Sequence, residues 1–184
     1  MRAGEIRHRA ELLELGPDLQ ERCLGRRWVG ILTQENAAPG APTSLRNPVR
    51  VDIRARYCPQ FVIGRYLRQG GRLFHLTSVR DPIGNRAELR ITGDELMGVP
   101  GQALVNGLAP RPCRVFLAFD VPFISPDHAQ GPVLRTYAEV ALIEAGRVEQ
   151  GDLLLVGADR YEVLSLAADR DDGVVRGLWL DLVQ

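Results

Sequence analysis

The sequence predicts an all-β protein made of two small β-barrel or sandwich units that are related by an internal repeat. Three observations support this fold class. Apolar and charged residues alternate with a period of two in many short segments, as they do in half-buried strands. Glycine and proline turns separate these segments, and no long helical period occurs. A similar pattern then returns 87 residues further along the chain.

The first strand is expected near the start of the chain, where apolar and charged residues alternate from Ile6 to Leu12. A helix over Glu5 to Leu15 is the rival prediction, because Glu and Leu favour helix. Trp28 to Leu32 predicts a second short strand. Thr33 to Pro48 is rich in proline and has no apolar period, so it predicts an exposed loop.

Residues 49 to 91 form the pattern on which the first unit depends. A strand alternates Val, Ile and Ala with charged residues at the start of this stretch. Phe61 to Leu67 and Leu73 to Val79 then predict a hairpin around the turn Arg68 to Gly71, since paired glycines supply the positive φ of a short turn. Glu88 to Ile91 predicts the last strand of this meander.

Adding 87 to a residue number in this meander leads to a similar residue without any gap. The matching pairs are Gly64 and Gly151, Leu67 and Leu154, Gly70 and Gly157, Phe74 and Tyr161, Ser78 and Ser165, and Val51, Ile53 and Val79 with Ala138, Val140 and Leu166. Glycines that recur at turns and apolar residues that recur in phase indicate a duplicated β unit. The alternative is that two unrelated meanders share turn glycines and alternation.

The second unit is predicted over residues 113–184. Its strands are expected at Val115 to Phe119, Thr136 to Ile143, Asp152 to Val156, Arg160 to Leu166 and Val174 to Val183, with a loop over Asp120 to Pro132. The last reversal is carried by Asp171, Asp172 and Gly173, an Asp-Gly turn signal.

Residues 96–112 are rich in glycine and proline and predict a linker between a first domain at 1–95 and the second unit. The residues that lie 87 positions after the first strand fall in this linker, so the second unit is expected to be one strand short. Since an unpaired sheet edge tends to be covered, we expect Ala103 to Val105 or a neighbouring protein to cover it.

The net charge of zero conceals an asymmetry between the halves of the chain. Residues 1–95 hold 16 arginines against 11 acidic residues, a charge of +5, whereas residues 96–184 hold 7 against 12, a charge of −5. Opposite charges suit head-to-tail contact between copies, or one face turned toward an anionic partner. Two solvated surfaces of different composition are the alternative interpretation.

Catalytic chemistry finds little support in the sequence, so we expect no enzyme activity, no cofactor and no metal. No P-loop, dinucleotide fingerprint, nucleophile elbow or zinc-protease motif occurs. The histidines and cysteines lie at no metal-ligand spacing; they are His8, His75 and His128 with Cys23, Cys58 and Cys113.

Three features of the first half resemble the head-tail joining proteins of tailed bacteriophages, the connector or stopper family. They are the opening Met1 to Arg9, the Trp28 strand, and Val51 to Tyr57 followed by Gly70 to Val79 and Arg86 to Leu89. They occur in the family's order and cover residues 1–95. The family's segment between the Trp strand and the Arg-Tyr strand is usually longer than it is here, and the acidic second unit is additional to its single domain.

The resemblance implies a non-enzymatic β-barrel virion protein that forms a ring beneath the portal, helps to retain packaged DNA and offers a docking surface for the tail. The implied partners are copies of itself in a cyclic oligomer, with six favoured and twelve possible, a portal or adaptor protein, and a tail terminator or tail tube protein. Packaged DNA would be contacted through its backbone, and no membrane is involved. Assembly would take place in the host bacterial cytoplasm.

The arginines of the first half are the candidates for contact with DNA phosphates, because Arg is a good phosphate ligand. The expected contacts on the DNA path or channel lumen are Arg7, Arg9, Arg46 and Arg50. The expected interface residues in the two loops are Asn36, Pro39, Arg46, Pro126 and His128. The alternative function is a cellular β-barrel module that binds nucleic acid or a small ligand.

Overall fold

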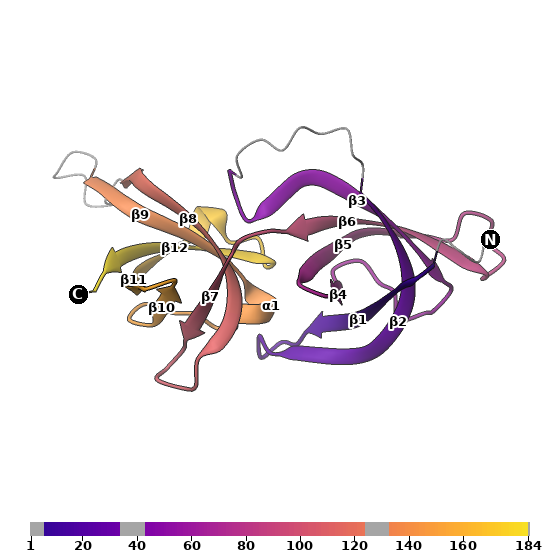
Figure 1. The fold of residues 1–184 in the computed structure, drawn as a ribbon, viewed down its shortest axis with the longest axis horizontal. Coiled ribbons are helices and arrows are strands. Elements are labelled where there is room, and N and C mark those ends of the chain that lie inside the picture. Colours follow the sequence, from indigo (N-terminus) through magenta and orange to yellow (C-terminus); the bar gives the residue numbers. More distant parts are fainter. Residues whose placement is uncertain (1–5, 34–42, 124–132, 184) are drawn as a thin grey trace. The chain divides into compact units, whose positions relative to one another are not determined.

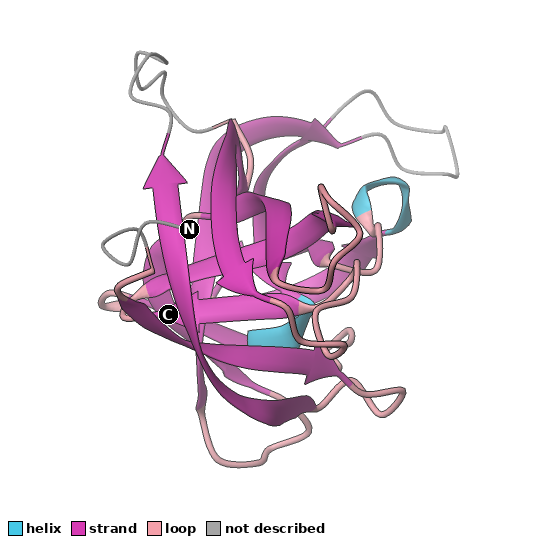
Figure 2. Cartoon of the chain, turned by 90° about the vertical axis from the view of Figure 1, so that its right-hand side faces the viewer, coloured by secondary structure: helices cyan, strands magenta, loops and turns pink. Residues whose placement is uncertain are grey.

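The structure, a computed structural model, describes residues 6–33, 43–123 and 133–183. The chain divides into two units, Met1–Met97 and Gly98–Gln184, and each is described separately here. Strands make up most of both units, as Figure 2 shows in magenta. The helical segments among the described residues are one turn at Leu142–Ala145 (α1) and a 3-10 turn at Ala168–Arg170 (η1). The predicted all-β class is confirmed.

The first unit is a closed barrel of six antiparallel strands (Figure 1). Its strands are β1 (His8–Leu15), β2 (Glu21–Thr33), β3 (Arg46–Arg56), β4 (Tyr66–Gln69), β5 (Arg72–Arg80) and β6 (Glu88–Leu96). They follow one another around the barrel in the order β1-β2-β3-β6-β5-β4, and β4 pairs with β1 to close it. The strand prediction for the opening segment is therefore confirmed over its helical rival.

The second unit is a closed barrel with the same connectivity. Its strands are β7 (Val99–Leu104), β8 (Arg111–Phe123), β9 (Val133–Ala141), β10 (Leu153–Val156), β11 (Asp159–Ala167) and β12 (Val175–Leu182). Around the barrel they run β7-β8-β9-β12-β11-β10, so each strand of the first barrel has one counterpart in the second. A shared order around two closed barrels supports the internal repeat.

Apolar side chains that alternate with polar ones along the strands fill the interior of both barrels. In the first barrel Ile53 of β3 and Phe74 of β5 are buried in one apolar cluster. The residues on either side of Ile53 are exposed or half-buried, whereas Leu73 beside Phe74 is also fully buried. In the second barrel Val140 of β9 and Tyr161 of β11 belong to a separate buried cluster. Because successive residues of a strand point to opposite faces, the same pattern that fills each interior also fixes which residues lie outside.

The predicted offset of 87 holds for the last three strands of each barrel. Gly64 donates its N–H to the Leu76 carbonyl at 2.9 Å, and Gly151 donates to the Val163 carbonyl at 2.8 Å. The ladder between β5 and β6 slips just before Ser78, and the ladder between β11 and β12 slips at the equivalent place. A register that repeats down to its bulge favours duplication over a chance resemblance of two meanders.

For β3 and β9, the strands that precede these three in each barrel, the predicted offset of 87 residues is wrong by two. Ile53 pairs with Ile91 in the first barrel, and in the second barrel Leu178, which lies 87 after Ile91, pairs with Ala138. The counterpart of Ile53 is thus Ala138 and not Val140. A shift of two keeps every side chain on its own face of the sheet, which is why the alternation gave no warning.

Helix α1 occupies the connection that absorbs these two residues, where a strand was predicted to continue through Ile143. Glu144 of α1 accepts hydrogen bonds from Arg114 of β8, at 2.9 Å from Nε and 2.8 Å from Nη2. Both side chains are largely buried. This ion pair holds the helical turn against the barrel wall. Its two residues are far apart in the sequence, so the apolar periodicity could not predict the pair.

The predicted linker is wrong where it matters most for the fold, because Val99–Leu104 forms strand β7. Ala103 of this strand pairs with Leu154 of β10 on one side and with Arg111 of β8 on the other. The second unit is therefore not one strand short, although the expectation that Ala103 would cover its open edge is confirmed. Gly101 is required there, since a Cβ would lie 2.9 Å from the Leu155 carbonyl oxygen.

The ends of several elements also differ from their predicted positions. Strand β4 begins at Tyr66 rather than Phe61, and it continues into the residues that were predicted to form the turn. Strand β3 begins at Arg46 and β8 continues to Phe123, so both strands take up residues assigned to the two long loops. Cross-strand pairing extends these segments beyond the point where local turn signals would end them.

Substitution of the hairpin glycines offers a test of the repeat. Gly70 and Gly157 have φ of +59° and +62°, whereas Gly71 next to the first of them has no positive φ, and its counterpart in the second barrel is Ala158. We expect Gly70→Ala and Gly157→Ala each to cost about 1–2 kcal/mol of unfolding free energy, because the left-handed region strains a Cβ. Gly71→Ala is the control and should be neutral. Equal urea midpoints for all three variants would contradict the shared turn geometry.

Candidate functional site

The outer face of the first barrel carries arginines from several strands. Ile53 and Ala55 of β3 point into the core, so Arg54 and Arg56 between and after them point outward. The same alternation holds on β6, where buried Ile91 follows exposed Arg90. The sheet therefore turns arginines outward from several strands at once.

Three of these arginines stand opposite one another on neighbouring strands. Arg54 of β3 pairs with Arg90 of β6, and Arg90 pairs with Arg80 of β5. Neighbouring strands lie about 4.8 Å apart, so three cations share a band about 10 Å wide. Like charges that are directly opposite in a sheet are destabilising. We call these three residues the arginine row.

Two members of the row lack the carboxylate partners that other arginines have. Arg80 and Arg90 are exposed, and neither forms an ion pair within the part of the chain that the structure describes; Arg54 is half-buried. Six other arginines of this barrel are matched to acids, namely Arg22, Arg26, Arg46, Arg65, Arg68 and Arg72. The positive charge of Arg80 and Arg90 is thus available to an anion from outside the barrel.

The second barrel shows that the fold itself does not require this row. The ladder positions equivalent to the arginine row hold Glu139, Gly177 and Ala167, which pair with one another in the same way. Glu139 is buried and accepts a hydrogen bond from the Tyr137 hydroxyl at 3.0 Å. The second barrel closes without any of the three arginines, so the fold does not require the repulsion between these like charges.

Sequence reasoning missed the row because its members are far apart in the chain. Arg80 and Arg90 come together only through the β5–β6 ladder, and Arg54 joins them through the β3–β6 ladder. The sequence did contain one signal. Each of these arginines lies next to an apolar residue of a predicted strand, which predicts that its side chain faces outward. The β3–β6 register could not be obtained without knowing that these two strands are neighbours in the barrel.

Arg7 and Arg9, two of the expected phosphate contacts, are both exposed. Arg9 lies opposite Trp28 of β2, and Trp28 is 58% exposed. These residues therefore lie on the outer face of the barrel, one or two strands away from the arginine row. Their position permits the expected contact with an anion.

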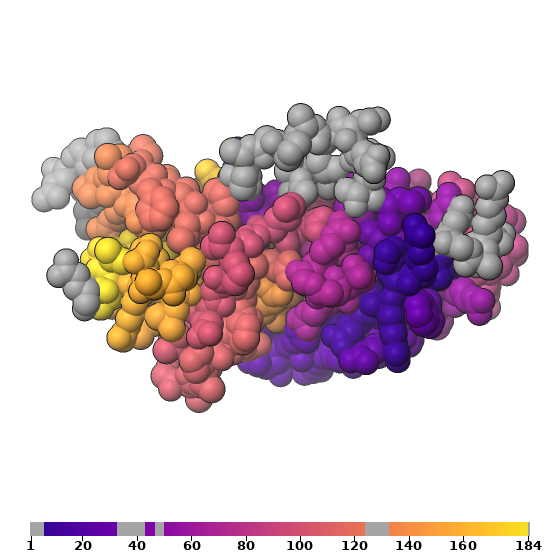
Figure 3. All heavy atoms as spheres, in the orientation of Figure 1, coloured from indigo at the N-terminus to yellow at the C-terminus, as the bar shows by residue number. Residues whose placement is uncertain are grey.

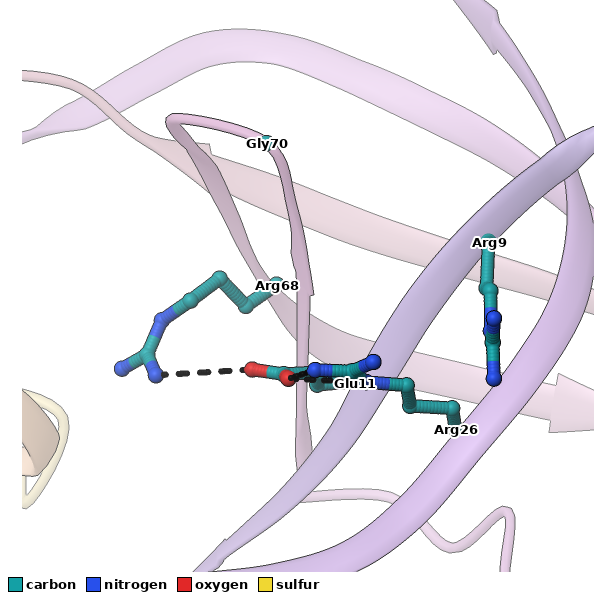
Figure 4. Close-up of a pocket in the computed structure, with 5 residues that line it drawn as sticks. All are labelled: Arg9, Glu11, Arg26, Arg68 and Gly70. Carbon is teal, nitrogen blue, oxygen red and sulfur yellow. Dashed lines mark hydrogen bonds and ion pairs between the residues drawn. The ribbon is translucent and has the colours of Figure 1, made fainter.

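Arg9 also lines a shallow hollow of about 300 Å³ on this barrel, together with Glu11, Arg26, Arg68 and Gly70 (Figure 4). The carboxylate of Glu11 lies between two guanidinium groups, 3.0 Å from Arg26 and 3.9 Å from Arg68. Arg68 also forms an ion pair with Glu21. Two of the three arginines in the hollow are thus matched by carboxylates, whereas Arg9 forms no ion pair among the described residues.

The other two expected contacts differ from each other. Arg46 is half-buried and donates a hydrogen bond to Asp94 Oδ2 at 3.1 Å, so the Asp94 carboxylate already neutralises its charge. Arg50 is exposed and lies at the ladder position opposite Asp94. The remaining interface candidates, Asn36, Pro39, Pro126 and His128, lie outside the described residues.

This arrangement of charge suits sequence-independent contact with a polyanion. Guanidinium groups bind phosphate oxygens well, and cations that do not reach base edges carry no sequence preference. Within residues 6–33, 43–123 and 133–183, no group of three or more His, Cys, Asp or Glu side chains is placed to hold a metal ion. The described residues also contain no helix that is long and apolar enough to cross a membrane.

The fold and its charged face together define a protein of two like β-barrels, one of which carries a cationic outer surface. No protein-family model, curated protein or solved structure matches this chain.

The cysteines provide a further test of the structure. Cys23 is exposed, whereas burial and the neighbouring Glu144 carboxylate raise the pKa of the Cys113 thiol to about 12. We expect a thiol reagent at pH 8 to modify Cys23 rapidly and to leave Cys113 unmodified until the protein unfolds. The unfolded thiol ionises near pH 9 and the folded one does not, so Cys113 should lower stability as the pH rises above 9. Rapid labelling of Cys113 in the folded protein would contradict its placement.

Proposed function

We propose that this protein is a head-tail connector of a tailed bacteriophage, which assembles as a ring beneath the portal, helps to retain packaged DNA and presents a surface to the tail. The observation that carries the proposal is the arginine row, which is built on one barrel and absent from its duplicate. The resemblance of residues 1–95 to connector proteins gives the row its expected partner, the packaged duplex.

A duplex suits the row because its backbone offers a continuous line of phosphates. The row crosses three strands and so extends across the barrel wall, which matches a long polyanion better than a single small anion. Contacts of this kind weaken with salt and permit DNA to slide past. A channel lining needs both properties, since DNA has to pass through it in packaging and in ejection.

The two barrels of each chain bear on the size of the ring. Six chains would present twelve barrels, so we favour six copies over twelve. The acidic second barrel, which adds to the single domain expected of a connector, would then supply either a wider ring or the surface that meets a tail component.

A cryo-EM reconstruction of the particle that contains this chain tests the proposal. We expect a closed ring in the neck, between the portal and the tail, with Arg80 and Arg90 turned toward the DNA path. Location of the chain anywhere else in the particle, or as isolated monomers, would refute the connector function.

A nucleic-acid-binding module of a cell is the second candidate, because the arginine row would serve it equally well. Its neighbourhood in the genome separates the two. Genes for a portal, a major capsid protein or a tail tube beside this one favour the connector, whereas their absence favours the cellular module.

A further inference from the structure

Strands β8 and β9 continue past the barrel as a two-stranded ribbon. Strand β12 accompanies β9 only as far as Thr136, whereas β8 and β9 go on pairing at Arg135, Leu134 and Val133. Figure 1 shows this ribbon leaving the second barrel at the upper left. The ladder slips between Ala118 and Val121, where Asp120 takes a φ of +54°. We call the segments 119–123 and 133–135 the ribbon.

The ribbon exposes apolar side chains that no described element of its own barrel covers. Phe119 is 62% exposed and Leu134 is 60% exposed. Figure 3 shows the atoms of both segments, salmon and orange at the upper left, at the molecular surface. Phe123, by contrast, packs against its own barrel. Its ring centroid lies 5.0 Å from that of Trp179 of β12, and the Arg135 guanidinium lies over its ring. Two-stranded ribbons are marginally stable alone, and exposed apolar clusters mark interaction sites.

The ribbon itself holds one acidic and one basic residue, Asp120 and Arg135, and two further acidic residues belong to β12 beside it and to β11. The carboxylates of these two residues, Glu162 and Asp181, stand opposite one another, both exposed, on β11 and β12. Asp181 follows Leu180, the partner of Thr136, and therefore lies near the base of the ribbon. A partner for this surface should combine apolar side chains with positive charge.

The first barrel carries such a surface on β2. Trp28 and Leu32 point outward and are 58% and 51% exposed, and Gly30, which is buried, lies between them on the same strand. Arg9 lies opposite Trp28, and Arg54 lies opposite Gly30. We call Trp28, Gly30 and Leu32 the tryptophan stripe. A large aromatic residue bordered by arginines is typical of the centre of a protein interface.

We propose that the ribbon of one copy docks on the tryptophan stripe of a second copy. The acidic residues beside the ribbon and the arginines beside the stripe are opposite in charge, as are residues 96–184 and 1–95 as wholes, at −5 and +5. Different surfaces meet in this contact, so each copy retains one free ribbon and one free stripe, and repetition leads to a ring if the rotation closes. This inference rests on the proposed connector function and names the contact that builds its ring.

Paired substitutions in the whole chain test the ribbon. Phe119→Ser with Leu134→Ser should convert oligomers of the wild type to monomers, as measured by light scattering over a range of concentrations. Leu108→Ser is the matched control, because Leu108 is 69% exposed on the same barrel but lies in the turn between β7 and β8. It should assemble as the wild type does. Circular dichroism and thermal melting establish that each variant is folded.

A mixing experiment tests whether the contact joins two different surfaces. The stripe variant, Trp28→Ser with Leu32→Ser, should also be monomeric. Mixed with the ribbon variant, it should form a 1:1 dimer and nothing larger, because only one intact ribbon and one intact stripe remain in the mixture. A mixture that stays monomeric would overturn the pairing of these two surfaces.

Two other results would overturn the inference without touching the connector function. They are assembly of the ribbon variant at wild-type concentrations, and a wild-type chain that stays monomeric at every concentration and salt. In both cases the position of the chain in the particle would still decide whether it is a connector. A ring seen in the particle with the ribbon and the stripe apart would reject the contact alone.

Discussion

Substitution of Arg80 and Arg90 by glutamine is expected to weaken binding to duplex DNA by about 10- to 100-fold at moderate salt. Each phosphate contact contributes about 0.9 to the slope of log affinity against log salt, so the slope should fall by about 1.8. The effect should be similar for any duplex sequence, because these side chains meet backbone phosphates and not base edges. Fluorescence anisotropy with a labelled duplex over a salt series measures both quantities.

The same variant should show no loss of stability. Arg80 and Arg90 are opposed like charges in one ladder, so their neutralisation relieves repulsion and should leave the thermal midpoint unchanged or raise it. Arg22→Gln with Arg26→Gln is the matched control, since both arginines are exposed but paired with Asp18 and Glu11. Equal loss of DNA binding in the control would show that total charge, and not the arginine row, governs the contact.

Truncation of the first barrel's core should have the largest effect on stability. Phe74 is completely buried among the apolar residues that fill this barrel, so Phe74→Ala should cost about 3–5 kcal/mol of unfolding free energy. Hydrogen exchange read by mass spectrometry should show reduced protection in β1 to β6. The reason is that all six strands close around the same cluster, and a cavity there weakens each of them.

The control for this experiment is Ile83→Ala. Ile83 is 79% exposed at the turn between β5 and β6, so its truncation should change the unfolding free energy by less than about 0.5 kcal/mol. A loss of protection for Phe74→Ala that is confined to β5 would contradict closure of the barrel around one core.

The sequence predicted the strands whose signals are local. Alternation and paired turn glycines located the hairpin around Gly70 and its repeat around Gly157, and these have the same φ region and the same ladder. Strand β7 was missed for a physical reason. Pro100 and Gly101 suppress its local strand signal, and only the open position between β8 and β10 makes this segment pair.

The candidate site was less accessible than the fold. Composition showed that the first half is rich in arginine, but it could not separate Arg46, which Asp94 neutralises, from Arg90, which has no ion pair among the described residues. That distinction depends on which strands are neighbours. The pairing of β3 with β6 passes over two intervening strands of the chain, and no periodicity within either strand encodes it.

Closure of the barrels also bears on how this protein behaves when many copies are crowded together. Every strand of the two barrels has a hydrogen-bonded neighbour on each side, so neither barrel presents the open row of amides that templates strand-by-strand aggregation. The ribbon has single-partner strands, and Pro122 in one of them lacks an N–H to donate. Crowded copies of this protein should therefore have little tendency to join edge to edge through the strands of their barrels.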